Sequence, residues 1–331
     1  MGASPDDPYG PGSPAAAGER AALVAEIAAT GALDDPAWRA AFEEVERHVF
    51  VPYYFVGRPG GYDRLWSGDP DPVRRERWLR GAYADEPLAI RVRDGELISS
   101  SSQPSLMARM LAELEVRDGH RVLEIGAGSG YNAALLAHRL GDDLVTTVDL
   151  DPEITESART HLAMAGYRPA VVTGDGARGC PERAPFDRII ATCTLPCVPV
   201  SWPAQCRPGA RILAPLATGL IALSVGEGDG ALGADRAEGR FLHTAAYFVP
   251  LRGAPPRIPR AFGQRLPRGS GHELFRFLLA LTEGSLDPRD ALSLWEREGR
   301  PARERYGVTV VGERQWAWLD DPAGPYVWPL A

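Results

Sequence analysis

A run of small residues between an acid and a tyrosine is the stretch of this chain best suited to chemistry. Glu124 closes a short apolar segment, and glycines then occupy every second position: Gly126, Gly128 and Gly130. Because glycine has no Cβ, such a loop lets the backbone approach a ligand, and the helix expected from Tyr131 begins with unpaired N–H groups. A dinucleotide-binding loop would have its third glycine where Tyr131 stands. The spacing therefore favours a nucleotide-like ligand other than a dinucleotide.

Two further acids follow strands downstream. The β-branched run 144–149 predicts a strand that ends in Asp149, where a second-strand carboxylate can accept the hydroxyls of a ribose. A strand over 170–173 leads to Asp175 and Gly176, where a carboxylate can receive an adenine amino group. Each acid taken alone would more often be an ordinary solvated loop residue. Because both follow strand ends in register with the glycine loop, cofactor binding is the better interpretation.

The elements that would position these residues alternate between strand and helix. Asp151 and Pro152 form a cap and first turn, and Gly166 ends the helix that follows. Strands are expected over 122–125, 144–149, 170–173, 187–192 and 211–215. This alternation predicts an α/β, Rossmann-like fold whose parallel sheet binds its ligand at the carboxyl ends of the strands.

Composition divides the chain into four parts. Residues 1–18 are rich in Pro, Gly and Ala and are expected to be disordered, and 19–115 are expected to form a helical, substrate-side region. In that region helices are predicted at 35–45 and 103–114, with a Gly/Pro/Asp-rich loop over 57–72. Residues 116–253 would form the cofactor-binding core, which ends in antiparallel strands near 220–225 and 240–251. Residues 254–331 would form a separate small α+β module, with helices near 272–283 and 288–298.

The overall composition excludes several classes of function. The chain has 331 residues, is 44% hydrophobic and carries a formal net charge of −8, which argues against a nucleic-acid partner. All 36 basic residues are arginine, so neither a pyridoxal Schiff base nor a phosphate-loop lysine is possible. Without a long apolar run or a secretion signal, we expect a cytoplasmic protein, monomeric and not bound to a membrane. The four cysteines have no paired spacing and the histidines are scattered, so no metal site is expected.

The acid-x-Gly-x-Gly-x-Gly loop is similar to that of S-adenosylmethionine-dependent methyltransferases, and other pieces resemble the protein-L-isoaspartate O-methyltransferase family. The resemblance covers roughly 36–253 and is most specific at Ser100-Ser101-Ser102-Gln103-Pro104. It also includes the stretches 46–52, 82–88, 174–176, 184–187 and 248–251. It implies a seven-stranded sheet whose last strand is antiparallel, with S-adenosyl-L-methionine as cofactor and S-adenosyl-L-homocysteine as product. The implied cofactor-binding residues are Glu124, Gly126, Ala127, Gly128, Ser129, Gly130, Tyr131, Asp149, Leu150, Asp175 and Gly176.

The same resemblance assigns an acceptor site. It implies that Ser102 lies beside the acceptor carboxylate, with Gln103 and Pro104 shaping the pocket and with Thr192 and Pro196 on the opposite wall. An alternative for Ser102 is a plain helix cap. The carboxylate is already ionised at neutral pH, because its pKa is near 4, so no general base is needed.

Residues after 253 depart from typical family members and leave the substrate open. Extended members resemble methyltransferases of ribosomally made peptide natural products, which esterify a chosen aspartate that then collapses to a succinimide (aspartimide). We therefore expect a dedicated peptide, bearing Asp or isoAsp, with general isoaspartate repair and a non-catalytic binding protein as alternatives. A flipped base is a poor fit, because 192–196 lack the Asn/Asp-Pro-Pro-aromatic set. Arginines of the tail could face an acidic peptide: Arg257, Arg260, Arg265, Arg268, Arg300, Arg303 and Arg305.

Overall fold

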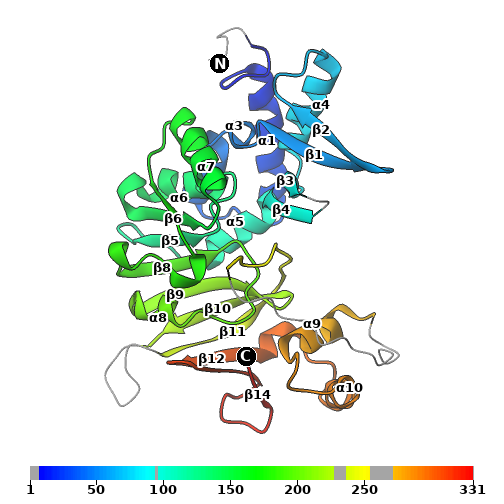
Figure 1. Ribbon diagram of the computed structural model, residues 1–331, viewed down its shortest axis with the longest axis vertical. Coiled ribbons are helices and arrows are strands. Elements are labelled where there is room, and N and C mark those ends of the chain that lie inside the picture. The colour runs from blue at the N-terminus through cyan, green and yellow to red at the C-terminus, as the bar shows by residue number, and fades with distance from the viewer. Residues whose placement is uncertain (1–6, 94–95, 227–235, 254–270, 331) are drawn as a thin grey trace. The chain divides into compact units, whose positions relative to one another are not determined.

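The computed structural model describes residues 7–93, 96–226, 236–253 and 271–330. The chain divides into two compact units, Met1–Gly174 and Asp175–Ala331, and each contains both helices and strands (Figure 1). No helix within the described ranges is long and apolar enough to span a bilayer.

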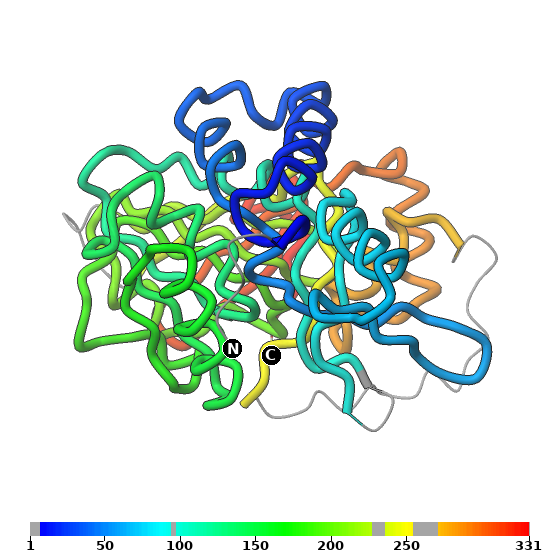
Figure 2. Tube along the Cα trace, turned by 90° about the horizontal axis from the view of Figure 1, so that it is seen from above, coloured from blue at the N-terminus to red at the C-terminus, as the bar shows by residue number. Residues whose placement is uncertain are grey.

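The first unit begins with helices whose first turns are marked in the sequence by capping residues. Ser13 and Asp35 cap the first two helices with their side chains, and a proline follows each cap. Helices α1 and α2 pack against each other, as the dark blue trace of Figure 2 shows. The prediction of disorder up to residue 18 is wrong from Asp7 onward, because residues 7–12 form turns that lead into the capped α1; residues 1–6 lie outside the described ranges. The helices are α1 Pro14–Ala29, α2 Pro36–Glu44, α3 Arg47–Phe50 and α4 Pro72–Ala82.

A four-stranded antiparallel sheet follows, in the order β2-β1-β3-β4. The prediction of a loop over 57–72 is wrong, because aromatic and β-branched residues before Gly57 start a hairpin that turns at Gly60 and Gly61. Strands β1 and β3 share a single residue pair, Phe55 with Ala89. The strands are β1 Tyr53–Arg58, β2 Gly61–Trp66, β3 Leu88–Arg93 and β4 Glu96–Ser101.

The rest of the first unit is a parallel β-α-β-α-β segment, as predicted. Strands β5, β6 and β7 pair in parallel, with helices α6 and α7 packed on them (Figure 1). Asp151 caps α7 by accepting the N–H of Glu153 at 2.9 Å, and Gly166 takes a φ of +88° just after the helix. These elements are α5 Pro104–Glu113, β5 Val122–Ile125, α6 Tyr131–Leu140, β6 Val145–Asp149, α7 Pro152–Met164 and β7 Ala170–Thr173.

The second unit starts with two parallel strands and continues as an antiparallel meander. Strand β8 pairs in parallel with β9, and β10 is antiparallel to both β9 and β11. The strand that runs against the parallel direction is thus β10, one position earlier in the chain than the resemblance implies. The elements are β8 Phe186–Ala191, α8 Ser201–Ala204, β9 Cys206–Leu216, β10 Gly219–Val225 and β11 Arg236–Ala245.

The C-terminal residues are not a separate module. Strand β12 pairs antiparallel with β11 from Arg236–Val311 to Arg240–Gly307, so the tail extends the same sheet. Helix α9 covers this sheet, with the ring of Phe277 4.8 Å from that of Phe241. Composition could not reveal this, because strand pairing joins residues that are far apart in sequence. The tail elements are α9 Glu273–Leu281, α10 Pro288–Arg297, β12 Tyr306–Val311, β13 Arg314–Leu319 and β14 Val327–Pro329.

Candidate functional site

The glycine loop leaves β5 and turns sharply into α6. The three alternate glycines all have positive φ, a backbone conformation that residues with a Cβ rarely adopt. At Gly130, a Cβ would lie 3.3 Å from the backbone oxygen of Ala158, so this glycine lets α6 start against α7. Gly128 has a φ of +51°, and Ala127 beside it is buried. The predicted loop is therefore present, although Gly130 serves helix packing.

The loop and the end of β6 meet at Asp149. One carboxylate oxygen of Asp149 accepts the N–H of Gly128 at 3.4 Å, and the other accepts the N–H of Asp151 at 3.2 Å. The next residue, Leu150, is apolar and still 39% exposed. The first unit thus brings together the predicted loop, the predicted acid and an open apolar residue at the carboxyl ends of parallel strands.

Glu124 lies on β5, the strand that leads into the loop, and has no surface exposed to solvent. Its Oε1 accepts the side-chain N–H of Asn132, in the first turn of α6, at 2.7 Å. Burial raises the pKa of Glu124 to about 7, while hydrogen bonds from Thr147 and Asn132 act in the opposite direction. The prediction that Glu124 contacts the cofactor is not what this geometry favours; the side chain ties β5 to α6 instead.

Two other predicted loop residues turn their side chains away from the strand ends. Tyr131 is buried between Phe42 and Phe50, with ring centroids 6.3 and 5.6 Å away. Ser129 is also buried, and its hydroxyl accepts the N–H of Tyr131 at a long 3.4 Å. The backbone groups of these two residues remain suited to ligand binding, and their predicted cofactor role stays a prediction.

These groups suit the cofactor that the loop resembles. An acid that ends a second strand accepts the two hydroxyls of a ribose, and Asp149 has both carboxylate oxygens at that strand end. The exposed Leu150 offers an apolar face to a purine, and the start of α6 offers backbone N–H groups to a carboxylate. The residues present therefore fit S-adenosyl-L-methionine.

The serine predicted to face the acceptor follows β4 and precedes α5. Ser102 is half-buried, and within the described residues its hydroxyl makes no hydrogen bond. It is not the cap of α5, because Asp85 accepts the N–H of Ser105 at 2.8 Å and so caps that helix from another segment. Asp85 also accepts the side-chain N–H of Gln103 at 3.1 Å, and Pro104 is the buried first residue of the helix. The cap interpretation of Ser102 is therefore wrong, and its hydroxyl is available.

A fully buried arginine fixes the backbone of this serine. Arg47 donates from Nη1 to the carbonyls of Ala82 and Ala84, both at 2.9 Å, and from Nη2 to those of Glu86 and Ser102, both at 3.1 Å. Burial lowers the pKa of Arg47 to about 10, which leaves the guanidinium charged at neutral pH. The sequence analysis assigned no role to this residue. No local pattern marked it, because Arg47 stands between Glu46 and His48 in a charged stretch, although a buried cation needs several acceptors.

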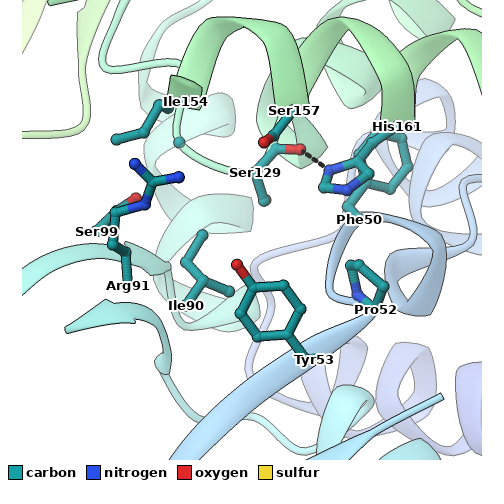
Figure 3. A pocket seen from close by; sticks show the side chains of 11 residues that line it. Phe50, Pro52, Tyr53, Ile90, Arg91, Ser99, Ser129, Ile154, Ser157 and His161 are labelled. Atoms are coloured by element: carbon teal, nitrogen blue, oxygen red, sulfur yellow. Dashed lines mark hydrogen bonds between the residues drawn. The ribbon is translucent and has the colours of Figure 1, made fainter. Parts of the chain in front are cut away.

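A pocket lies beside the loop, between α7 and the four-stranded sheet (Figure 3). Nδ1 of His161 donates to the backbone oxygen of Ser129 at 3.0 Å, so this tautomer leaves Nε2 as an acceptor. Burial lowers the pKa of His161, which keeps the ring neutral. This histidine thus holds the loop through the backbone of Ser129. The pocket encloses about 420 Å³ with its open mouth and is lined by Phe50, Pro52, Tyr53, Ile90, Arg91, Ser99, Gly128, Ser129, Ile154, Ser157 and His161.

The remaining predicted residues belong to the second unit. Asp175 is half-buried, and one of its carboxylate oxygens accepts the N–H of Ala177 at 2.9 Å. Gly176 is buried, and its carbonyl accepts the indole N–H of Trp202 at 2.9 Å. Thr192 is half-buried and comes directly after β8. Within this unit Asp175 thus has a capping role, and its role toward a ligand stays a prediction.

Metal chemistry has no support among the described residues, where no group of three His, Cys, Asp or Glu side chains could hold an ion. None of the four cysteines, all of which lie within the described ranges, forms a disulfide, and burial raises the pKa of Cys206 to about 12.

The fold and the loop define the class of protein: the chain has the fold of the class I S-adenosylmethionine-dependent methyltransferases. A solved protein-L-isoaspartate O-methyltransferase superposes with a TM-score of 0.61 at 24% identity, covering 88% of this chain and 96% of the other.

Sequence comparison gives the family. The family model described as protein-L-isoaspartate(D-aspartate) O-methyltransferase matches residues 71–253, more than half of the chain, and the chain belongs to that family. The protein-L-isoaspartate O-methyltransferase 1 of Archaeoglobus fulgidus is 34% identical over 215 residues, which is 64% of this chain and 84% of the relative. The protein-L-isoaspartate O-methyltransferase of Methanopyrus kandleri is 43% identical over 138 residues, which is 41% of this chain. That match spans 59% of the length of the Methanopyrus protein.

Proposed function

We propose that this protein is an S-adenosylmethionine-dependent carboxyl O-methyltransferase that acts on isoaspartyl residues of peptides and proteins. One observation carries the proposal: the buried Arg47 fixes the backbone of Ser102, whose hydroxyl makes no hydrogen bond within the described residues, in the unit that also holds the Gly128–Asp149 contact. Family membership supports the same reaction class.

The chain needs few groups for this chemistry. Bound S-adenosylmethionine supplies an activated methyl group. The acceptor carboxylate is ionised at neutral pH, so the protein has to hold it and exclude water, and no base is required. The Ser102 hydroxyl donates a hydrogen bond to that carboxylate, with Gln103 and Pro104 beside it.

The product prepares the repair step. In the methyl ester, the backbone nitrogen of the next residue forms a bond to the ester carbonyl carbon. The bond to the methoxy group breaks, and methanol leaves with the amide proton. The resulting succinimide opens with water to aspartate or isoaspartate, and this step needs no residue of the enzyme.

A groove next to Ser102 suits a peptide acceptor better than a small molecule. The groove has an empty volume of about 1050 Å³ and lies where β1 and the segment before β3 separate. Glu86 lines it, and the carbonyls of Glu86 and Ser102 accept from the same nitrogen of Arg47, so the groove wall adjoins the serine. An extended chain on both sides of the acceptor residue needs such an open channel.

A substrate dedicated to this chain has weaker support. That idea rested on a separate arginine-rich tail, and the tail is part of the sheet of the second unit. Arg303 is 4% exposed and pairs with Glu273, and Arg305 pairs with Asp320, so these two cations serve the fold. Arg300 is exposed and lies over the Trp295 ring, 5.3 Å from its centroid. The other four arginines of the proposed patch lie outside the described residues: Arg257, Arg260, Arg265 and Arg268. We therefore favour general isoaspartate repair.

The test is methyl transfer to matched peptides. The full chain is incubated with S-adenosylmethionine and a peptide containing one isoaspartate, or with the same peptide containing aspartate. Mass spectrometry should show one added methyl group and released methanol for the isoaspartyl peptide alone. Equal methylation of both peptides would point to a dedicated aspartyl substrate, and cofactor binding without methylation of either would make the chain a binding protein.

A further inference from the structure

The loop after β8 carries Thr192 and Pro196, and its first half is held by its own neighbours. Thr194 exchanges two backbone hydrogen bonds, donating to the carbonyl of Val249 and accepting from Leu251, both at 2.9 Å. Leu195 donates to the carbonyl of Pro215 at 2.8 Å, at the end of β9. These contacts hold residues 194 and 195 of the loop.

A further contact with the loop comes from the C-terminal tail. Gln315, on β13, accepts the N–H of Val198 through Oε1 at 2.8 Å and donates to the carbonyl of Val198 through Nε2 at 3.1 Å. Both backbone groups of one loop residue are thus satisfied by a single side chain. An amide side chain suits this contact because it accepts through its oxygen and donates through its nitrogen, whereas a carboxylate only accepts and an ammonium only donates.

The contact between Gln315 and Val198 is buried, and the strand that carries Gln315 is paired within the sheet. Gln315 is 9% exposed, and Val198 is 1% exposed. Strand β13 pairs with β12 along six residue pairs, and β12 pairs with β11. Gln315 also lies beyond residue 253, where the family match ends, so the anchor belongs to the added part of the chain. A buried hydrogen-bonded pair in such a setting fixes the loop, since breaking it leaves polar backbone without partners.

We propose that Gln315 is a positioning residue, through which the C-terminal tail fixes the loop that carries Thr192 and Pro196. The inference rests on the proposed function, because it is the family resemblance that assigns Thr192 and Pro196 to the methyl acceptor. It assigns the tail a role inside the enzyme instead of recognition of a separate partner.

The experiment compares Gln315→Ala with a matched variant in the same sheet, Thr309→Val. Thr309 is also buried and polar, but its hydroxyl bonds Glu238 and Trp318 and not the loop. Hydrogen exchange of the Val198 amide and steady-state kinetics with an isoaspartyl peptide are measured on the full-length chain. Thermal unfolding of each variant shows how much stability it has lost.

Gln315→Ala should speed exchange at Val198 and lower kcat for the peptide roughly tenfold, with the affinity for S-adenosylmethionine unchanged. Thr309→Val should leave both readouts at the wild-type level. Gln315→Glu keeps the acceptor and loses the donor at neutral pH, so it should give an intermediate kcat.

Unchanged exchange at Val198, or a kcat loss equal to that of Thr309→Val, overturns the inference. A wild-type chain that methylates no isoaspartyl peptide instead overturns the proposed function, and the exchange measurement still tests the anchor.

Discussion

The guanidinium of Arg47 donates through Nη2 to the carbonyl oxygen of Ser102 at 3.1 Å, and this buried contact sets where the Ser102 hydroxyl stands. The same nitrogen also holds Glu86, so two segments far apart in the chain share one cation. Because Arg47 has no exposed surface, the dipoles of the carbonyls that it binds and the nearby carboxylate of Asp85 stabilise its charge in place of water.

Arg47→Met should lower the free energy of unfolding by about 3–5 kcal/mol, because it leaves buried carbonyls without a donor. At a temperature where the variant is still folded, kcat for the peptide should fall while the affinity for S-adenosylmethionine holds. Arg47→Lys keeps the charge but loses the planar guanidinium with its several N–H donors. Its stability and its kcat should therefore lie between those of the wild type and those of Arg47→Met.

The matched control for Arg47 is Arg39→Met, because the Arg39 side chain is 52% exposed and pairs only with Glu43 on the same helix. It should change stability by about 0.5 kcal/mol or less. Denaturant unfolding measures both variants, and equal losses at the two arginines would contradict the role given to Arg47.

Asp149 and Ser102 should separate cofactor binding from transfer. Asp149→Ala removes the carboxylate at the end of β6, so calorimetry should show at least a tenfold loss of affinity for S-adenosylmethionine. Ser102→Ala should leave that affinity intact and slow transfer roughly tenfold to a hundredfold, as expected for one lost hydrogen-bond donor. Equal loss of cofactor affinity in both variants contradicts this division.

Local patterns allowed much of the first unit to be predicted. The cap at Asp151, the glycine after α7 and the helix starting at Tyr131 were all confirmed, because each depends on residues close together in sequence. The β1–β2 hairpin was missed, since the composition of its turn outweighed the strand-forming residues before it.

Long-range contacts explain what the sequence could not reveal about the site. Arg47 and Ser102 are separated by 55 positions, and Gln315 and Val198 by 117. Neither pair leaves a local signal, because each joins a side chain to a backbone group, which any residue type can supply. Glu124 and Tyr131 were placed in the correct loop, but the direction of a side chain depends on packing that the motif does not specify.

Glu124 should make stability depend on pH. Burial raises its pKa from 4.5 to about 7, so the stabilising contribution of the protonated form is complete below pH 4.5 and is lost as pH rises through 7. Glu124→Gln keeps an oxygen for Asn132 and never ionises. The variant should therefore gain stability over the wild type between pH 5 and 8, by up to about 3 kcal/mol. Urea unfolding of the wild type and of Glu124→Gln at pH 5 and at pH 8 tests this. An equal change in the free energy of unfolding of the two proteins between these pH values would contradict it.

Removing the tail should destroy the second unit instead of sparing activity. A chain ending at Gly253 loses the pairing of β12 with β11, leaves β11 as an unprotected edge strand and uncovers Phe241. General repair with a detachable module would predict full activity on short isoaspartyl peptides. The register of β11 with β12 predicts loss of solubility and of cooperative unfolding.

A chain ending at Asp321 is the control, because it keeps β12, β13 and Gln315 and loses, of the tail's strands, only the short β14. Calorimetry and methyl transfer should rank the wild type first, the Asp321 chain next and the Gly253 chain last; a fully active, stable Gly253 chain would show that the sheet does not need its tail.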